Sequence, residues 1–311
     1  MTFNEVGTIA IVGSGSIGLY YGGKLAAQGA DIRFLMRSGF EEARQRGIHI
    51  FSKQGGDIHL ERPSVFREAL DIGPSDLVVI ALKATANDSL ESLLPPLLHN
   101  ETTLLTLQNG LGNEEFLAER HGAHRVQGGL CFVCLTRRSP ASVDHVGHGM
   151  LSIGEFAGPP LPRTRLIVDA FRESGIDARL VEDLTAERWR KLVWNIPFNG
   201  LAVAEGGLSV DRILADPALR ARCRSLMEET IAASTALGHP IDEDYATLQL
   251  ERTYSMGAYQ PSTLVDWLAG KPLEIEAIWG EPLRQAKKTG ISLPHLERLY
   301  EHLRTLDAGR S

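Results

Sequence analysis

Short apolar runs alternate with segments of helical periodicity along the first 110 residues. Apolar, largely β-branched runs predict strands, at residues 8–12, 31–36, 77–82 and 103–107. Helical spacing of apolar residues predicts helices at 17–28 and 88–98, and Gly55-Gly56 marks a small hairpin over 47–60. Strands that are apolar on both faces and separated by helices predict a parallel sheet with helical crossovers.

The pattern changes twice further along the chain. From 126 to 156, strand-like runs and glycine turns follow one another without a helix, which predicts strands added at one end of the sheet. A helix is expected at 164–174 and a strand at 178–181. Beyond residue 183 all predicted elements are helices, at 186–198, 217–237, 242–254, 273–288 and 294–306.

These elements predict a fold of two parts. Residues 1–185 form an α/β Rossmann-type doubly wound sheet, and residues 186–311 form an all-helical C-terminal domain. The length of 311 residues and the contents of 43% apolar and 23% charged residues agree with a soluble globular protein of two domains.

Charge and hydropathy exclude several kinds of partner. The net charge is −7 and neither predicted domain is basic, which argues against a nucleic acid or an anionic membrane surface as the partner. The longest apolar runs, such as 77–82, fall far short of the roughly 18 residues that span a bilayer. The N-terminus lacks the pattern of a secretory signal, so we expect a cytoplasmic protein.

The cysteines and histidines show spacings that metal or redox sites also use. Cys131 and Cys134 lie in an apolar strand-like run, where a period of two points them to opposite faces, so buried core thiols are the favoured interpretation. Two histidine pairs have a spacing of three residues, but they lie in glycine-rich loops without further ligands: His121 with His124, and His145 with His148. We predict no metal site.

A glycine-rich turn joins the first strand to the first helix. Its residues are Gly13, Ser14, Gly15, Ser16, Ile17 and Gly18. A G-x-G-x-x-G sequence between a strand and a helix is typical of dinucleotide binding, with the pyrophosphate at the helix N-terminus. Gly13 permits the tight turn, Gly15 lets the backbone approach the phosphates, and Gly18 lets the helix pack on the strand.

The end of the second strand carries a cation in place of the usual carboxylate. Arg37 occupies the zone in which NAD-binding chains have Asp or Glu for the ribose 2′-hydroxyl. A guanidinium suits a 2′-phosphate, so NADP(H) is favoured over NAD(H). The alternative is an ordinary solvated arginine.

Polar residues also follow two later strands. Lys83 comes directly after 77–82, and Asn109 follows 103–107 within Gln-Asn-Gly. Ligands of open α/β sheets bind at the carboxyl ends of the strands, so both residues are candidates for cofactor binding. The alternatives are an exposed lysine at a strand end and a turn asparagine before Gly110.

A row of polar residues interrupts an otherwise apolar helix. Lys191, Asn195 and Asn199 are spaced by four and share one helix face, with Glu187 one turn earlier. A buried lysine opposite a dinucleotide site suits proton transfer. In the alternative interpretation Lys191 snorkels or pairs with Glu187, and the asparagines bind loop backbone. Pro197 predicts a kink in this helix.

Two further residues stand at predicted helix starts. Ser262 fits a helix N-cap, and Glu274 fits a first-turn carboxylate that stabilises the helix dipole. Spacing alone assigns neither of them a function.

Taken together and in this order, the motifs resemble those of the ketopantoate reductase (2-dehydropantoate 2-reductase) family. The resemblance runs from about residue 8 to 305. It rests on GSGSIG, Ala-Leu-Lys83, Gln-Asn109-Gly, the Lys191-x-x-x-Asn195-x-x-x-Asn199 helix, Ser262-Thr-Leu-x-Asp, Glu274-Ile-Glu-x-Ile-x-Gly, and Val-Asp-His145-Val-Gly-His-Gly.

The resemblance implies an active site between the two domains and NADPH-dependent reduction of 2-dehydropantoate to pantoate, on the route to pantothenate and coenzyme A. It implies Lys191 as the general acid and a small anionic 2-oxo acid as the substrate. The residues that would bind this substrate are Asn109, Asn195, Asn199, Ser262, at its carboxylate region, and Glu274, at a hydroxyl or at the lysine. Lys83 and Asn109 would lie near the nicotinamide ribose and the reacting carbonyl. A homodimer is expected from analogy with dehydrogenases that have helical C-terminal domains.

Some positions depart from the family pattern. Trp279 stands where members often have Asn, Lys271-Pro272 replaces a more polar stretch, and Pro261 precedes Ser262. Because these positions would lie on the substrate side, a reductase of another branched 2-oxo acid is one alternative. A non-catalytic NADP(H) sensor is the other, although a sensor has no need of a proton donor.

Overall fold

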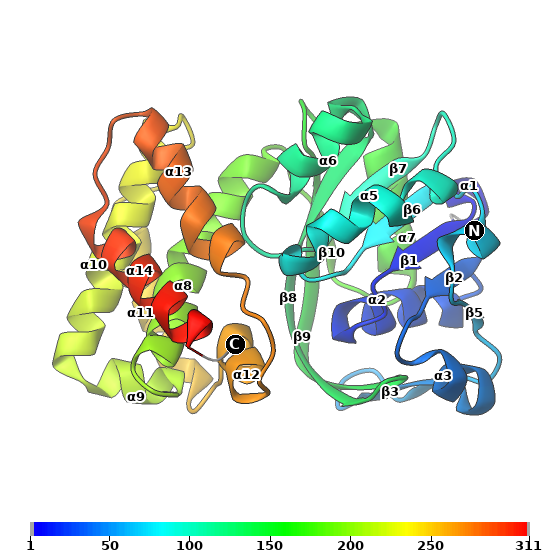
Figure 1. The fold of residues 1–311 in the computed structure, drawn as a ribbon, viewed down its shortest axis with the longest axis horizontal. Coiled ribbons are helices and arrows are strands. Elements are labelled where there is room, and N and C mark those ends of the chain that lie inside the picture. Colours follow the sequence, from blue (N-terminus) through cyan, green and yellow to red (C-terminus); the bar gives the residue numbers. More distant parts are fainter. Residues whose placement is uncertain (1–2, 310–311) are drawn as a thin grey trace. The chain divides into compact units, whose positions relative to one another are not determined.

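The computed structural model describes residues 3–309, which divide into two compact units. The first unit holds the described residues up to Gln108 together with Asn113–Leu184. The second unit holds Asn109–Gly112 and the described residues from Thr185 onward. The assignment of Asn109–Gly112 to the helical unit is not visible in the sequence pattern, because the segment lies far from residue 185 along the chain. Figure 1 labels the elements of both units.

The first unit contains a ten-stranded sheet within the described part of the chain, in the order β4-β3-β9-β8-β7-β6-β1-β2-β5, with β10 beside β9. Its strands are β1 (Ile9–Val12), β2 (Ile32–Leu35), β3 (Ile48–Ser52), β4 (Ile58–Leu60), β5 (Ser64–Phe66), β6 (Leu77–Ile80), β7 (Thr103–Thr106), β8 (Val126–Ser139), β9 (Ser142–Glu155) and β10 (Ala178–Leu180). The helices are α1 (Phe3–Val6), α2 (Ser16–Ala27), α3 (Phe40–Arg46), α4 (Ala69–Ile72), α5 (Leu90–Leu93), α6 (Asn113–His121) and α7 (Pro162–Glu173).

The predicted parallel sheet is confirmed. β1 pairs in parallel with β2 on one side and with β6 on the other, and β7 continues the sheet beyond β6. Alternate residues of β1 face two different apolar clusters: Ile9 and Ile11 pack on one side of the sheet, Ala10 and Val12 on the other. The strand order reverses beside β1, which is where open α/β sheets bind ligands at their carboxyl ends.

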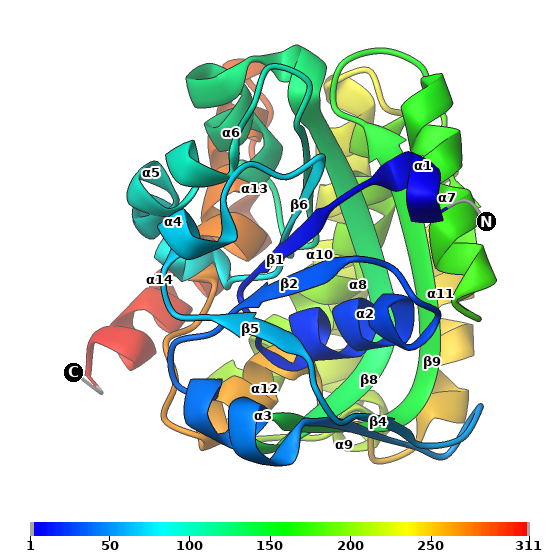
Figure 2. The ribbon, with the colours of Figure 1, turned by 90° about the vertical axis from the view of Figure 1, so that its right-hand side faces the viewer.

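The predicted strands at one end of the sheet are also confirmed. β8 and β9 form a long antiparallel pair, and β3 of the predicted 47–60 hairpin pairs in parallel with β9. Register shifts such as the one between Phe132 and Val133 add bulges, which bend the pair. The bend of β8 and β9 across the unit is visible in Figure 2.

Short elements account for most differences from the sequence-based prediction. The helix expected at 88–98 is only the one-turn α5, flanked by the 3₁₀ turns Ala84–Ser89 and Pro95–Leu97, because consecutive prolines cannot continue an α-helix. β5, α3, α4 and α6 were not predicted. They are too short for hydrophobic periodicity to distinguish them from loops.

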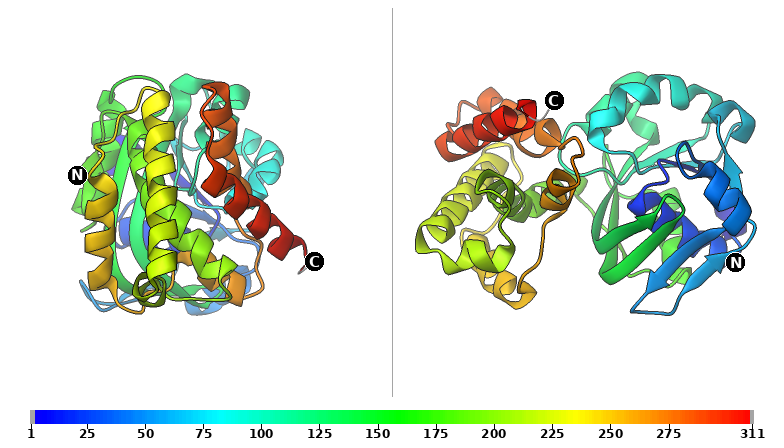
Figure 3. Two further views of the ribbon diagram at one scale, coloured as in Figure 1. Left: turned by 90° about the vertical axis from the view of Figure 1, so that its left-hand side faces the viewer. Right: turned by 60° about the horizontal axis from the view of Figure 1, so that its bottom comes forward.

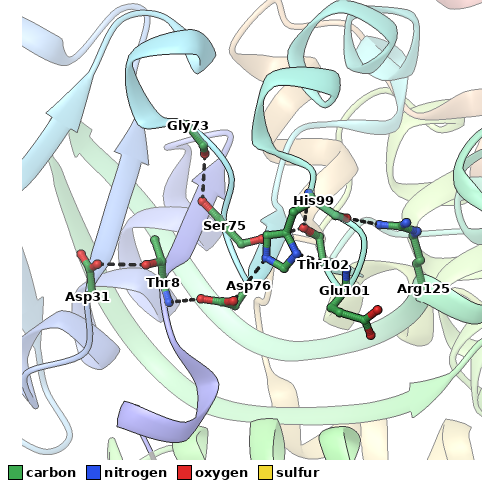
Figure 4. Close-up of polar contacts among 9 residues, drawn as sticks. All are labelled: Thr8, Asp31, Gly73, Ser75, Asp76, His99, Glu101, Thr102 and Arg125. Carbon is green, nitrogen blue, oxygen red and sulfur yellow. Dashed lines mark hydrogen bonds and ion pairs between the residues drawn. The ribbon is translucent and has the colours of Figure 1, made fainter.

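Polar side chains at the amino ends of the parallel strands bind one another (Figure 4). Asp76, just before β6, accepts from the Thr8 backbone N–H at 2.8 Å and from His99 Nε2 at 3.2 Å. His99 Nδ1 in turn accepts from the Glu101 N–H at 3.1 Å, so Nε2 is the protonated nitrogen. Thr8 Oγ1 donates to Asp31 at 3.2 Å. These groups tie neighbouring strands together at this edge of the sheet.

The second unit is helical, as predicted (Figure 3). Its elements are α8 (Leu184–Ala204), α9 (Val210–Ala215), α10 (Pro217–Ala236), α11 (Tyr245–Thr253), η4 (Tyr254–Met256), α12 (Ser262–Leu268), the π-helical η5 (Glu276–Gly280), α13 (Glu281–Lys288) and α14 (Pro294–Ala308). The core packs large side chains that are fully buried, among them Trp189, Phe198 and Trp279. α8 continues through Pro197, and the helix predicted at 273–288 begins with the π-helical turns of η5. No described helix has the length and apolar character that a membrane span requires.

Candidate active site

The glycine-rich turn after β1 is tightly packed at two positions and open at a third. Gly13 has φ of +100°, and a Cβ there would lie 2.5 Å from the Leu82 backbone nitrogen. A Cβ on Gly18 would lie 2.2 Å from the Gly13 carbonyl oxygen. A Cβ on Gly15, the N-cap residue of α2, would meet nothing within 4 Å. The turn therefore leaves open space beside the N-terminus of α2, where an anionic group would find backbone N–H donors.

The remaining residues of the turn hold it against the sheet. The buried Ser14 hydroxyl donates to the Leu35 carbonyl at 2.9 Å, which ties the turn to the end of β2. Ser16 is the first residue of α2, and Ile17 packs partly buried against the apolar cluster under that helix.

Two predicted cationic residues lie at the carboxyl edge of the same sheet. Arg37 is exposed two residues beyond β2, and the pairing of Val12 with Leu35 puts the end of β2 level with the end of β1. Lys83 is exposed three residues beyond β6, whose end Ile80 also pairs with Val12. Since these strands are parallel, both cations follow strands that end at the edge carrying the glycine-rich turn.

Gln108 anchors the end of β7 through a chain of amide hydrogen bonds. Its Oε1 accepts from Thr106 Oγ1 at 2.9 Å and its Nε2 donates to Asn87 Oδ1 at 2.7 Å. Asn87 Nδ2 then donates to Asn113 Oδ1 at 3.0 Å. Sequence reasoning assigned Gln108 no role. Its position directly after the strand was the available signal.

The second unit brings Lys191 and Asn109 together. Lys191 Nζ donates to Asn109 Oδ1 at 2.9 Å, although the residues lie 82 positions apart in the chain. Lys191 is half-buried on α8. Glu187, which was the alternative partner for this lysine, forms an ion pair with Arg190. The contact joins the Lys191 amine to an amide oxygen that fixes its direction.

The two asparagines of the α8 row have different surroundings. Asn199 is buried, and its Oδ1 accepts from the Thr263 backbone N–H at 3.1 Å and from Ser262 Oγ at 3.5 Å. Asn199 therefore secures the start of α12, as the alternative interpretation expected. Asn195 is only 8% exposed, yet its amide has no hydrogen-bond partner within residues 3–309. Because the Asn199 amide is already bound to the start of α12 and the Asn195 amide has no such contact, Asn195 is the better candidate for binding a ligand.

Ser262 and Glu274 both lie at the beginnings of helices in the second unit. Ser262 is the first residue of α12 and is exposed, and the N-cap is Pro261, so the predicted N-cap role of Ser262 is wrong. Glu274 is 7% exposed and its carbonyl accepts from the Ile278 N–H at 3.1 Å as the helix begins. Glu274 is thus a buried ionisable side chain of the second unit.

Trp279 does not lie on a substrate side. Its side chain is 0% exposed within the core of the second unit, and its indole N–H donates to the Ile196 carbonyl at 3.0 Å. The expectation that Trp279 contacts substrate is therefore wrong. The large side chain fills the core against α8, where a Cβ on Gly200 would lie 3.0 Å from the indole nitrogen.

The predicted burial of Cys131 and Cys134 is only partial. Both residues are half-buried on β8, where Cys131 packs against the apolar core of the first unit. The bulge between Phe132 and Val133 interrupts the alternation that would place the two residues on opposite faces. Cys223 is the buried thiol, and burial raises its pKa to about 12. Among residues 3–309 no His, Cys, Asp and Glu side chains gather in a way that could hold a metal ion.

Two family models match the chain and together cover most of it. The model described as ketopantoate reductase PanE/ApbA matches residues 9–158. The model described as ketopantoate reductase PanE/ApbA C terminal matches residues 183–307. The two matches fall on either side of the point where the β/α pattern gives way to helices.

Individual proteins of this kind match over almost their whole length. A 2-dehydropantoate 2-reductase from Nostoc is 38% identical over 303 residues, covering 96% of this chain and 94% of its own. The crystal structure of 2-dehydropantoate 2-reductase from Geobacter metallireducens is 42% identical with a TM-score of 0.93, covering 96% of this chain and 99% of its own. That from Methylococcus capsulatus is 33% identical with a TM-score of 0.91, covering 98% of both chains.

Proposed function

The chain belongs to the ketopantoate reductase family of NAD(P)H-dependent oxidoreductases, and on that premise we propose that it reduces 2-dehydropantoate to pantoate with NADPH. This reaction lies on the route to pantothenate and coenzyme A. The observation that supports the proposal most strongly is the hydrogen bond from Lys191 Nζ to Asn109 Oδ1. Reduction of a ketone requires a proton at the oxygen, and Lys191, oriented by this contact, would donate it.

The first unit has the groups that a dinucleotide requires. The open space at Gly15, at the N-terminus of the twelve-residue helix α2, fits a pyrophosphate, and the exposed Arg37 fits a 2′-phosphate. Lys83 would contribute a further cation to the bound cofactor. When bound, NADPH supplies the hydride that adds to C2 of the substrate.

The second unit would complete the reaction and hold the substrate. The Lys191 ammonium stabilises negative charge on the C2 oxygen and donates a proton to it, while Asn109 accepts another of its protons and so fixes its direction. The Asn195 amide, which has no hydrogen-bond partner among residues 3–309, would bind a polar group of the substrate. Glu274 would accept from a substrate hydroxyl. Asn199 and Ser262 would bind the substrate at the start of α12, where the two side chains contact each other.

The proposed activity is tested by following NADPH absorbance with purified protein and a panel of 2-oxo acids that includes 2-dehydropantoate. We expect the highest kcat/KM for 2-dehydropantoate. A higher kcat/KM for another branched 2-oxo acid would favour the sister reductase. NADPH binding without turnover of any 2-oxo acid would contradict an enzymatic role and favour the sensor.

Replacement of Arg37 tests the choice of cofactor. We expect Arg37→Ala to weaken NADPH binding by about 10- to 100-fold and NADH binding by less than about twofold, because one charge-assisted contact to the 2′-phosphate is lost. Fluorescence titration of each dinucleotide measures this. Arg44→Ala, at an exposed position on α3, is the matched control. Equal losses for NADPH and NADH would exclude Arg37 from 2′-phosphate recognition.

The homodimer and the cytoplasmic location stay predictions. Size-exclusion chromatography coupled to light scattering would measure the mass in solution and so decide between monomer and dimer.

A further inference from the structure

A proline leaves one carbonyl of η5 without its helical donor. The Glu281 N–H donates to the Glu276 carbonyl five residues earlier, which is the π-helical pattern. In the same register residue 282 would donate to the Ala277 carbonyl, but residue 282 is proline and has no N–H. The Ala277 carbonyl instead accepts from the Leu111 N–H at 2.9 Å.

The segment that supplies this donor carries Asn109. Gly110, between Asn109 and Leu111, has φ of +85°, and a Cβ there would lie 2.3 Å from the Ala277 oxygen. Only glycine permits so close an approach of two backbones in this conformation. The sequence Asn109-Gly110-Leu111 is therefore held against η5 by a backbone hydrogen bond and by direct backbone contact.

The same short helix also contacts the helix that carries Lys191. Trp279, two residues after Ala277, donates its indole N–H to the Ile196 carbonyl of α8 at 3.0 Å. Ile196 lies next to Asn195 and little more than one turn from Lys191. η5 thus contacts both the segment of Asn109 and the helix of Lys191, which are the two sides of the Lys191–Asn109 hydrogen bond.

We propose that η5 is the positioning element for the proton donor: Pro282 keeps the Ala277 carbonyl available, so that Asn109 is held where Lys191 can donate to it. Pro282, Gly110 and Trp279 are positioning residues, because each acts through Asn109 or α8. The inference rests on the proposed function, in which Lys191 is the general acid. Misplacement of a catalytic group by about 1 Å costs about 10²-fold in rate, so a small shift of this segment has a measurable effect.

The test is Pro282→Ala, which restores an N–H that competes with Leu111 for the helix carbonyl. Alanine favours the helix, so we expect the melting temperature to stay at or above that of the wild type. We expect kcat to fall about tenfold, roughly the effect of one lost hydrogen bond, while KM for NADPH changes by less than about twofold. The Leu111 amide should exchange its hydrogen for deuterium faster than in the wild type.

Pro294→Ala is the matched control. Pro294 lies in the first turn of α14, where a helix N–H has no helical acceptor, so the missing N–H of proline costs nothing. We expect this variant to keep the kcat and the Leu111 exchange rate of the wild type.

A double-mutant cycle separates positioning from a general structural effect. If Pro282 acts through Asn109, Pro282→Ala should change kcat by less than about twofold in an Asn109→Ala background. An equal loss in both backgrounds, or no loss in the wild-type background, would overturn the inference. So would unchanged exchange of the Leu111 amide, a result that needs no turnover. Absence of 2-oxo acid reduction by the wild type would instead contradict the proposed function, so the two failures are distinguishable.

Discussion

Replacement of Lys191 by methionine should lower kcat for 2-dehydropantoate reduction by about 10²- to 10⁴-fold. Methionine keeps the length of the side chain and removes the ammonium. The substrate oxygen then loses both its proton donor and the charge that stabilises it, and Asn109 Oδ1 loses the Lys191 donor. Steady-state kinetics with a fixed, saturating NADPH concentration measure the effect.

The same variant should bind NADPH with an affinity within about twofold of the wild type, because the glycine-rich turn and Arg37 belong to the other unit. Lys288→Met is the matched control: it removes an exposed lysine from α13 of the same unit and should leave kcat unchanged. A Lys191→Met enzyme with wild-type kcat would remove Lys191 from the mechanism. A large loss of NADPH affinity would show that its role lies in binding the cofactor.

Gly15→Ala should weaken NADPH binding by about 10- to 100-fold without lowering the melting temperature. The protein itself has room for the added methyl group, since a Cβ at this position meets nothing within 4 Å. That space is where the pyrophosphate would approach the N-terminus of α2, so the methyl group would displace it from charge-assisted hydrogen bonds with the backbone. Fluorescence titration with NADPH and thermal unfolding measure the two effects separately.

Gly147→Ala provides the control for Gly15→Ala. A Cβ on Gly147 also meets nothing within 4 Å, and this residue lies on β9, away from the glycine-rich turn in sequence. We expect unchanged affinity for NADPH there. Equal affinities of Gly15→Ala and wild type would contradict the dinucleotide role of the turn. Gly18→Ala cannot test the dinucleotide role of the turn, because its Cβ would lie 2.2 Å from the Gly13 oxygen and would disturb the fold itself.

The errors of the sequence-based prediction concern features that a local sequence pattern does not reveal. The burial of Cys131 and Cys134 was predicted from the apolar run around them, whereas both residues are only partly buried on β8. Ser262 was assigned as an N-cap, although the helix begins one residue earlier than that role requires. Trp279 was expected on the substrate side from its position in the family pattern, whereas its side chain lies in the core. In each case the deciding factor was the local backbone path or a distant packing partner.

The glycine-rich turn and the row on α8 were determined by the sequence itself. Their conformations depend on residues a few positions apart: glycines permit the turn after β1, and a spacing of four aligns Lys191, Asn195 and Asn199 on one helix face. Short-range periodicity and glycine placement carry this information directly, and for the same reason the parallel sheet and the helical second unit were predictable.

Only the tertiary structure decided which polar groups meet. It joined Lys191 to Asn109 across 82 positions, bound Asn199 to the start of α12 and left Asn195 without a partner among residues 3–309. It also grouped Asn109–Gly112 with the helical unit, where the Leu111 N–H donates to the Ala277 carbonyl. Such contacts depend on how whole elements pack, and a hydrogen bond tolerates only small errors in distance and angle. Local pattern therefore supplied the candidate residues, and packing selected the pairs.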